Sequence, residues 1–153
     1  MRLALFQPDI PQNVGAAVRL AACMGVILEI IEPCGFALTA PGLRRVAMDY
    51  GPAARIERRA SWEAFLAAEA RREGRLVLFT TRAAQPYADF AFQAADTLLF
   101  GRESAGVPDA VHAAAQARLI IPITAQTRSL NLVTAAAMAL GEGLRQTDGF
   151  PAQ

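Results

Sequence analysis

Near the end of the chain, polar residues stand between an apolar segment and a helix, where packing alone would need few of them. In the stretch "TRSLN", Arg128, Ser129 and Asn131 follow the apolar residues 118–123 and precede an alanine-rich helical segment. A helix needs one N-cap, and either Ser129 or Asn131 would serve. The surplus of hydrogen-bonding side chains therefore indicates a binding or catalytic site, with a doubly capped helix as the alternative.

Two further segments place polar residues directly after apolar runs. "GRESAGVP" follows the apolar residues 97–101, and it contains two glycines five residues apart with Glu103 between them. "QPDIPQNVG" follows residues 2–6, and Asn13 is placed to cap a helix that carries Arg19. Glycines let backbone amides approach a ligand, and a helix N-terminus offers free N–H groups. Together the segments predict a ligand site built largely from backbone.

The regular elements explain how these segments would meet. Several expected strands are apolar throughout, which indicates burial on both faces, so we expect an α/β fold with a mostly parallel sheet flanked by helices. Ligands of such sheets bind at the carboxyl ends of the strands. The expected strands are residues 2–6, 26–31, 54–58, 75–81, 97–101 and 118–123. The expected helices are residues 14–24 after the cap Asn13, 43–50, 62–73 after the cap Ser61, 108–116, and a last helix after Asn131.

Composition narrows the class of protein. The 153 residues suit one domain, 1–153, and 54% hydrophobic with 19% charged residues is typical of a globular protein. The first apolar run ends before Pro8 and no run approaches the length of a membrane helix, so we expect no membrane segment, no signal peptide and a cytoplasmic location. Cys23 and Cys34 are expected to be free thiols, and with His112 as the one histidine we expect no metal site.

The net charge of +1 makes no general electrostatic case for nucleic acid. All fifteen basic residues are arginine, which fits phosphate recognition and a GC-rich genome equally well. Arginines cluster within residues 44–45, 55–59 and 71–75, and such clusters suit a solvated face as well as phosphate. The sequence leaves their role open.

The familiar nucleotide-binding and hydrolase motifs are missing. "GRESAG" has the glycine spacing of a P-loop, but no Lys followed by Ser or Thr comes after it. No G-x-G-x-x-G follows an expected strand, and His112 lies in an ordinary helical segment, which excludes a Ser-His-Asp triad. The residues by themselves predict a site without naming its ligand.

In order and spacing, the three segments resemble the motifs of the SPOUT class of RNA methyltransferases, in its SpoU-like branch that methylates the ribose 2′-hydroxyl. "NVGAAVR" (13–19) resembles the first motif, "LLFGRESAGVP" (98–108) the second and "IIPITAQTRSLNLVTAAAMAL" (120–140) the third. The resemblance covers almost the whole chain, and three motifs in order are far more specific than any one. Arg102, where relatives often carry Pro, is a departure that leaves the motif's Gly and Glu intact.

The resemblance implies a deep trefoil knot at the C-terminal end of the sheet, which we would not propose otherwise because knots are nearly absent from proteins. It implies S-adenosylmethionine as the cofactor, with contacts from Phe79, Gly101, Ile121 and Ser129. It also implies a homodimer formed through the last helix and the first. Two glycines in the last helix fit such close helix packing, with a frayed helix end as the alternative.

The segments "QPDIPQNVG", "IIEPCGF" and "LRRVAMDY" further resemble a branch of small enzymes that methylate the wobble cytidine or uridine of tRNA. This implies the tRNA anticodon stem-loop as partner. The alternatives are the same chemistry on ribosomal RNA or at another tRNA position, a non-catalytic RNA- or nucleotide-binding module, and a flavodoxin-like small-ligand binder. The polar residues of all three motifs are present, which argues against a non-catalytic member.

By resemblance, Arg19, Ser129 and Asn131 are the catalytic residues. The substrate hydroxyl must lose a proton, and no histidine or evident carboxylate base is at hand. A guanidinium with a pKa above about 12 is a poor proton acceptor, so we expect Arg19 to hold the substrate phosphate and stabilise the developing alkoxide. Ser129 and Asn131 are expected to orient the ribose.

Four residues are expected to contact or frame the substrate, namely Asn13, Arg19, Glu103 and Arg128. Glu103 is expected to bond loop amides or Asn13, a role that is as much structural as catalytic. Arg128 is expected to contact an RNA phosphate, with a surface salt bridge as the alternative.

Overall fold

A seven-stranded parallel sheet, in the order β3-β2-β1-β6-β4-β7-β5, forms the centre of the molecule. The structure is a computed structural model that describes residues 1–39, 41–42, 45 and 48–152. The strands are β1 Arg2–Phe6, β2 Ile27–Ile31, β3 Arg55–Arg59, β4 Leu76–Phe79, β5 Gln85–Pro86, β6 Thr97–Phe100 and β7 Ala117–Ile120. The expected α/β fold with a mostly parallel sheet is confirmed.

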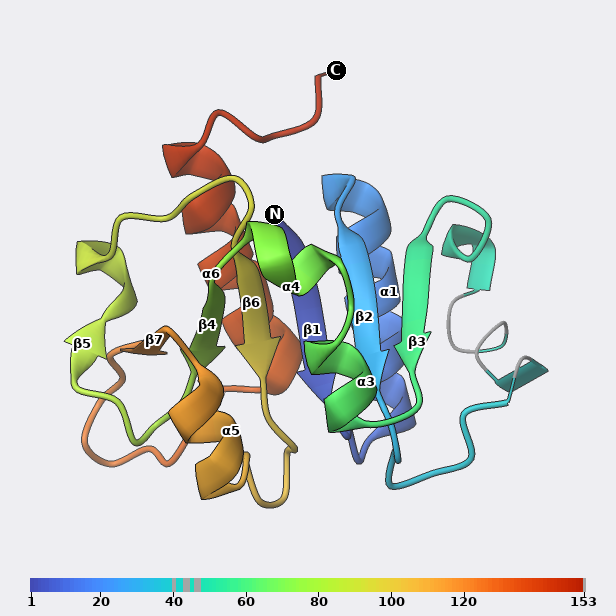
Figure 1. Cartoon of the computed structure of the whole chain (residues 1–153), viewed down its shortest axis with the longest axis horizontal. Coiled ribbons are helices and arrows are strands. Elements are labelled where there is room, and N and C mark those ends of the chain that lie inside the picture. The colour runs from blue at the N-terminus through green and yellow to red at the C-terminus, as the bar shows by residue number, and fades with distance from the viewer. Residues whose placement is uncertain (40, 43–44, 46–47, 153) are drawn as a thin grey trace.

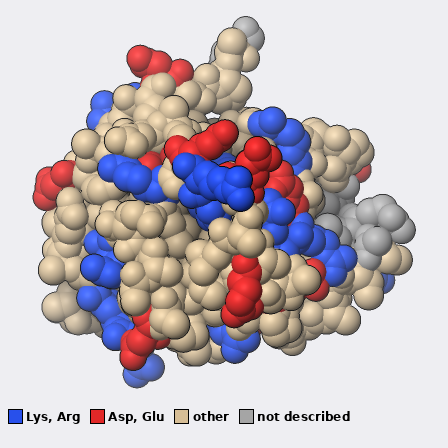
Figure 2. All heavy atoms as spheres, viewed as in Figure 1, with Lys and Arg blue, Asp and Glu red and all other residues tan. Residues whose placement is uncertain are grey.

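Helices cover both faces of this sheet, with α1 and α6 on one face and α3, α4 and α5 on the other (Figure 1). Charged side chains of both signs gather on the second face, over α4 and the nearby parts of β2 and β3 (Figure 2). Among the described residues, no helix has the length and apolar character needed to cross a membrane. The helices are α1 Pro11–Met24, α3 Trp62–Leu66, α4 Ala70–Glu73, α5 Asp109–Ala114 and α6 Leu132–Gln146, with the 3-10 turns η1 Met48–Tyr50 and η2 Tyr87–Asp89.

Alternation along the strands divides the core between the two faces. In β1, Leu3 and Leu5 pack in the cluster that holds α1 and α6, whereas Ala4 and Phe6 pack in the cluster that holds α3 and α5. All four are buried. This two-sided burial explains why a central strand such as β4, with the sequence LVLF, is apolar at every position.

Helix α1 begins earlier than expected. Ile10 is the N-cap and Pro11 takes the first helical position, where the missing N–H of proline costs no hydrogen bond. Asn13, predicted to be the N-cap, is instead a buried residue of the first turn. The predicted end at Gly25 is confirmed, since this residue has φ 66° and its amide caps the helix.

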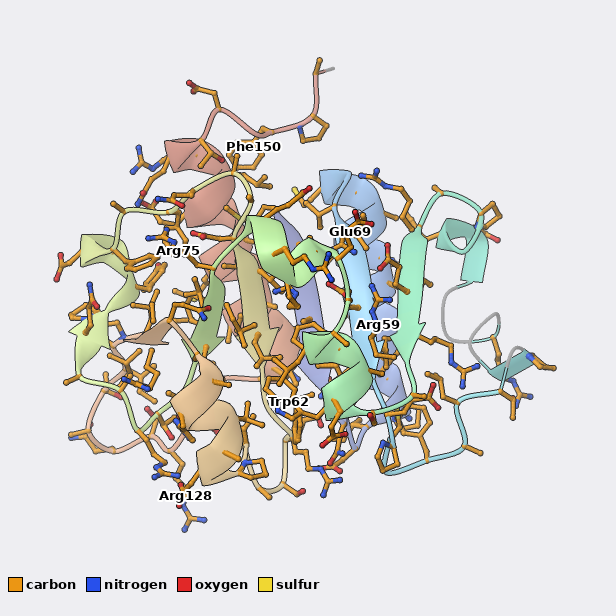
Figure 3. All side chains as sticks on the ribbon, in the orientation of Figure 1. Arg59, Trp62, Glu69, Arg75, Arg128 and Phe150 are labelled. Carbon is orange, nitrogen blue, oxygen red and sulfur yellow. The ribbon has the colours of Figure 1, made fainter. Side chains whose placement is uncertain are left out.

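The expected helix 62–73 is two short helices. Ser61 does cap the first, because its hydroxyl accepts a hydrogen bond from the Ala64 amide at 3.2 Å. Trp62 of α3 lies over the sheet (Figure 3), with its ring 5.7 Å from that of Phe6. After the break, α4 places the guanidinium of Arg71 4.7 Å from the centre of the Phe65 ring. The packing of Trp62 against Phe6 and of Arg71 against Phe65 therefore overrides the local helix propensity of residues 62–73.

Smaller differences concern element ends. Strand β4 ends at Phe79 rather than at residue 81, and β7 spans Ala117–Ile120 rather than 118–123. Strand β5 was not expected, because two residues carry no periodicity. The expected helix 43–50 falls largely outside the described residues, which show only η1 at its end. Both cysteines are free thiols, as predicted.

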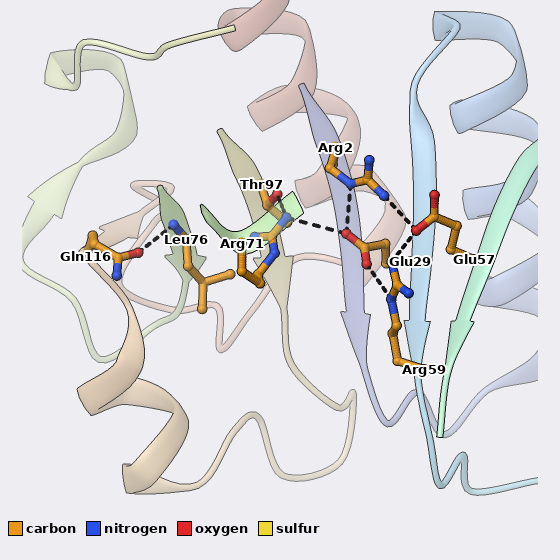
Figure 4. A network of polar contacts seen from close by, with 8 residues as sticks. All are labelled: Arg2, Glu29, Glu57, Arg59, Arg71, Leu76, Thr97 and Gln116. Atoms are coloured by element: carbon orange, nitrogen blue, oxygen red, sulfur yellow. Dashed lines mark hydrogen bonds and ion pairs between the residues drawn. The ribbon is translucent and has the colours of Figure 1, made fainter. Parts of the chain in front are cut away.

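A buried ion-pair network lies on the face of the sheet that α4 covers (Figure 4). Glu29 of β2 is fully buried, and its carboxylate accepts hydrogen bonds from Arg2 Nε at 2.9 Å and Arg59 Nε at 2.8 Å. Arg71 Nη2 lies 3.4 Å from the same carboxylate. Glu57 joins Arg2 to Arg59. A charge inside an otherwise apolar strand is thus compensated from three elements.

This network answers part of the question raised by the arginine clusters. Arg59 and Arg71 are structural, and burial lowers the pKa of Arg71. Arg75 pairs with Asp96 at 2.7 Å, and Arg58 pairs with Glu32 at 2.9 Å. Most arginines of the 55–59 and 71–75 clusters therefore compensate carboxylates of the fold.

We expect Glu29→Ala to lower the free energy of unfolding by about 3–5 kcal/mol, because it leaves buried arginines without their shared carboxylate. Urea unfolding followed by circular dichroism measures the effect. Glu142→Ala is the matched control, since it breaks an exposed pair with Arg145 and is expected to leave the midpoint nearly unchanged. Equal midpoints for Glu29→Ala and the wild type would contradict a stabilising role of the network.

Candidate functional site

A cavity of about 550 Å³ opens at the carboxyl ends of β4, β6 and β7. This volume lies in the range of small-molecule and cofactor sites. All three polar segments of the sequence contribute to its wall, the first through Ile10 and Asn13, the second through residues 101–107 and the third through residues 128–132. The topology thus brings together segments that are remote in sequence.

The structure places eight of the nine predicted site residues on the cavity wall. The four expected cofactor contacts are among them, and so are four residues expected to act on the substrate. The eight are Asn13, Phe79, Gly101, Glu103, Ile121, Arg128, Ser129 and Asn131.

Arg19 is the ninth residue, and it is not among the described residues that line the cavity. It is exposed on α1, where its guanidinium lies 4.6 Å from the centre of the Tyr50 ring. Its predicted catalytic role stays a prediction.

The glycine spacing of the second segment has a structural cause. Arg102 and Gly106 exchange two backbone hydrogen bonds of 2.9 Å, which close the segment into a narrow loop. A Cβ on Gly101 would lie 2.6 Å from the carbonyl carbon of Gly106, and Gly106 itself has φ 66°. The first glycine therefore permits close backbone approach and the second permits a left-handed turn.

Glu103 ties the second loop to the first. Its carboxylate accepts a hydrogen bond from the Asp9 amide at 2.8 Å and another from Asn13 Nδ2 at 2.8 Å. These are the loop-amide and Asn13 contacts that the sequence suggested. Both carboxylate oxygens are engaged, so the geometry favours a positioning role for Glu103 over that of a general base.

Asn131 ties the third loop to the first. It is the N-cap of α6, since its Oδ1 accepts from the amides of Val133 and Thr134 at 2.9 and 3.2 Å. Its Nδ2 donates to Asn13 Oδ1 at 3.1 Å. Ser129, the other candidate for the cap, is exposed on the cavity wall.

Sequence reasoning missed two residues of this arrangement, Asp9 and Ser104. The Asp9 carboxylate accepts hydrogen bonds from both the amide and the hydroxyl of Ser104, and these bonds hold the pKa of Asp9 below its ordinary value. The two residues stand 95 positions apart, so no local spacing could pair them. The only signal was their place beside Asn13 and Glu103.

The remaining wall is apolar and aromatic. The rings of Phe79 and Phe100 stack with centroids 4.9 Å apart and an interplanar angle of 12°. Ile120 and Ile121 continue this surface from β7. Within the part of the chain that the structure describes, no group of three or more His, Cys, Asp or Glu side chains could hold a metal ion. The site offers apolar walls, backbone groups and a few fixed polar side chains.

Known proteins resemble this chain over nearly its whole length. The model of the SpoU rRNA methylase family matches residues 1–141. A tRNA (cytidine(34)-2′-O)-methyltransferase of Beijerinckia indica is 55% identical over 144 residues, which cover 94% of this chain and 90% of that protein. The enzyme of the same name from Ancylobacter novellus is 52% identical, over 98% of this chain and 95% of its own.

Two solved structures extend the comparison. One, described as giving structural insights into the 2-OH methylation of C/U34 on tRNA, matches with a TM-score of 0.87 and 41% identity, over 95% of this chain and 94% of that one. The SpoU methyltransferase AviRb from Streptomyces viridochromogenes, in complex with AdoMet, matches with a TM-score of 0.84 and 26% identity. This chain covers 95% of its own length and 60% of AviRb in that match.

We expect Glu103→Ala to accelerate amide hydrogen exchange at Asp9 by about ten- to a hundredfold, because a charged acceptor of that N–H is lost. Exchange followed by NMR measures the rate at this one amide. Ser104→Ala is the matched control, because it removes only a hydroxyl donor to Asp9 and is expected to leave the Asp9 amide protected. Equal acceleration in both variants would contradict the link through Glu103.

Proposed function

The chain belongs to the SpoU methylase family, and from this premise we propose that it transfers a methyl group from S-adenosylmethionine to the ribose 2′-hydroxyl of the wobble cytidine or uridine in tRNA. The observation that carries the proposal is the identity of 52–55%, over nearly the full length, with two relatives named for this reaction at cytidine 34. The convergence of the three polar segments on one cavity supports it.

Ribosomal RNA is the second candidate substrate, because the family model carries that name. Sequence identity favours tRNA. The structure concerned with C/U34 of tRNA is 41% identical to this chain, whereas the AdoMet-bound rRNA methyltransferase from Sinorhizobium meliloti is 26% identical.

The cavity fits the cofactor. Gly101, where a Cβ would overlap the Gly106 backbone, keeps the second loop narrow at the cavity wall, and Phe79 and Ile121 add apolar walls. Ser129 brings a hydroxyl to the same wall. When bound, S-adenosylmethionine supplies a methyl group already activated on a sulfonium. These four residues would hold it.

The chain's own part in the reaction is to position the reactants. Holding two reactants in an attack geometry can supply on the order of 7–11 kcal/mol. Ser129 and Asn131 would orient the ribose, while Glu103 keeps the loops in place. Arg19 lies outside the cavity of its own chain, so its expected role, to hold the substrate phosphate and stabilise the alkoxide, would be exerted on the cavity of a second copy, while the hydroxyl proton passes to solvent water.

The trefoil knot belongs to this proposal. Strand β7 lies beyond β4, whereas α6, which follows it in the chain, contacts β6 and α1 on the far side of the sheet. The segment 121–131 therefore returns past the carboxyl ends of β4 and β6, and this return supports the proposed knot. We take residues 1–153 as one domain that contains the knot. A cytoplasmic location follows from tRNA as the substrate.

Incubation with labelled S-adenosylmethionine and total RNA is expected to label the 2′-oxygen of nucleotide 34 in tRNA.

Gly101→Ala is expected to weaken cofactor binding by about tenfold or more, because its Cβ would overlap the Gly106 backbone. Ser129→Ala tests the same wall at an exposed residue, where folding is not at risk. Calorimetric titration measures the affinity of each variant for S-adenosylmethionine.

In the incubation with total RNA, label confined to ribosomal RNA would contradict the proposed substrate, and no label in any RNA would contradict the proposed activity.

We also propose a homodimer formed through α1 and α6. The two helices contact each other, and part of their outer surface is small and apolar, with Ala16 and Cys23 from α1 and Ala137 and Met138 from α6 all exposed. Met138 alone is 40% exposed. Such a surface permits close approach of a second copy. A dimer would also give a small enzyme more surface to hold an anticodon stem-loop.

Ala137→Arg is expected to convert the dimer to a monomer, because a charge would be buried against the partner. Light scattering coupled to size-exclusion chromatography measures the mass. Ala64→Arg is the matched control on the exposed surface of α3, on the opposite face of the sheet, and is expected to leave the mass unchanged. A monomeric wild type would contradict the proposed assembly.

A further inference from the structure

Three exposed arginines lie between the cavity wall and helix α5. Arg82 comes two residues after Thr80 of the cavity wall, and its Nη1 lies 2.9 Å from the carboxylate of Asp109 at the start of α5. Arg118 of β7 donates to the carbonyl oxygen of His112, in the same helix, at 2.7 Å. Arg128 lies on the cavity wall itself. We call Arg82, Arg118 and Arg128 the basic track.

The members of the track lie close enough to act together. Burial first, and then the charges of Arg82 and Arg118 with Asp109 opposing them, lowers the pKa of His112. His112 therefore sits among these charges. Figure 3 places Arg128 beside the lower end of α5, and Figure 2 shows basic surface along the same side of the molecule.

The track concentrates positive charge in a nearly neutral chain. With Asp109 included, this surface carries a net charge of +2, whereas the whole chain carries +1, so the remainder carries −1. Most other paired arginines that the structure describes are matched to buried or shared carboxylates, as around Glu29 and Asp96. Among the described residues, Arg118 and Arg128 form no ion pair with a carboxylate, so their charge is available to a ligand beside the cavity.

The one ion pair in the track is weak. The side chains of Arg82 and Asp109 are 64% and 87% exposed, and exposed pairs of this kind contribute little to stability. Arg82 can exchange Asp109 for a phosphate at small cost. Arg118 and Arg128 are exposed as well, and a guanidinium matches phosphate oxygens with two parallel N–H donors.

The geometry points to the RNA backbone as the occupant, and we propose that the basic track binds phosphates of the substrate strand that flank the nucleotide in the cavity. This inference rests on the proposed function. The target ribose must enter the cavity, so its neighbouring phosphates leave from the cavity mouth, where Arg128 lines the wall and Arg82 directly follows the wall residue Thr81. The six residues of α5 span about 9 Å, on the order of two to three nucleotide steps of a helical strand. The track consists of guanidinium groups, which match phosphate oxygens, so the proposal assigns it to the RNA backbone.

The test removes the two arginines that lie outside the cavity wall. Arg82→Ala and Arg118→Ala are each expected to raise the KM for tRNA about three- to fivefold, with the KM for S-adenosylmethionine unchanged. The slope of log Kd for tRNA against log salt concentration is expected to fall by about 0.7–0.9 for each arginine, and by the sum in the double variant. Arg72→Ala, which removes an exposed arginine of α4, is the matched control and is expected to change neither quantity.

Asp109→Ala adds a gain-of-function arm, because freeing Arg82 from its carboxylate is expected to lower the KM for tRNA. A double variant with wild-type KM for tRNA and wild-type salt slope would overturn the track, and so would an equal effect of Arg72→Ala. These outcomes differ from failure of the proposed function, in which the wild type itself transfers no methyl group to tRNA.

Discussion

The arrangement of the site depends on the side-chain amide of Asn13. This amide is buried, and its two ends are used in opposite senses, with Nδ2 donating to Glu103 and Oδ1 accepting from Asn131. A buried amide must be satisfied at both ends, and only one of its two orientations can do so here. One side chain therefore sets the relative positions of all three loops around the cavity. Asp9 and Ser104 extend the same chain of hydrogen bonds along the first and second loops.

The rest of the fold supplies a rigid frame for that contact. Strands β1 and β6 pair in the middle of the sheet. The first turn of α1, which follows β1, carries Asn13, and the loop after β6 carries Glu103. Helix α6 packs on the same sheet and starts at Asn131, so the third loop cannot shift without moving a core helix. The Glu29 network secures the other side of the sheet under α4, where apolar burial is replaced by compensated charge. Arginine thus has two uses, one inside the frame and one beside the cavity.

Much of the fold could be predicted from sequence because its signals are local. The apolar run of β6 predicts a buried strand, and the glycine after α1 predicts the end of a helix, each from a few neighbouring residues. The errors came where a remote partner overrides a local preference. Asn13 is a good N-cap by type, but Pro11 starts the helix and Glu103, 90 residues away, takes the amide. The 62–73 segment has helical composition throughout, but the packing of Trp62 and the reach of Arg71 toward Glu29 divide it.

By itself the sequence determined the alternation of strands and helices, the three polar segments and their resemblance to methyltransferase motifs, because each of these is written in short spacings. Only the tertiary structure decided that Asn131, and not Ser129, caps α6, that Arg59 and Arg71 serve Glu29, and that Arg19 lies away from the cavity of its own chain. The physical reason is the range of the interactions. Apolar burial is imposed by patterns a few residues long, whereas a hydrogen bond or ion pair requires two groups within about 3 Å, and which groups meet is settled only when the sheet brings distant loops together.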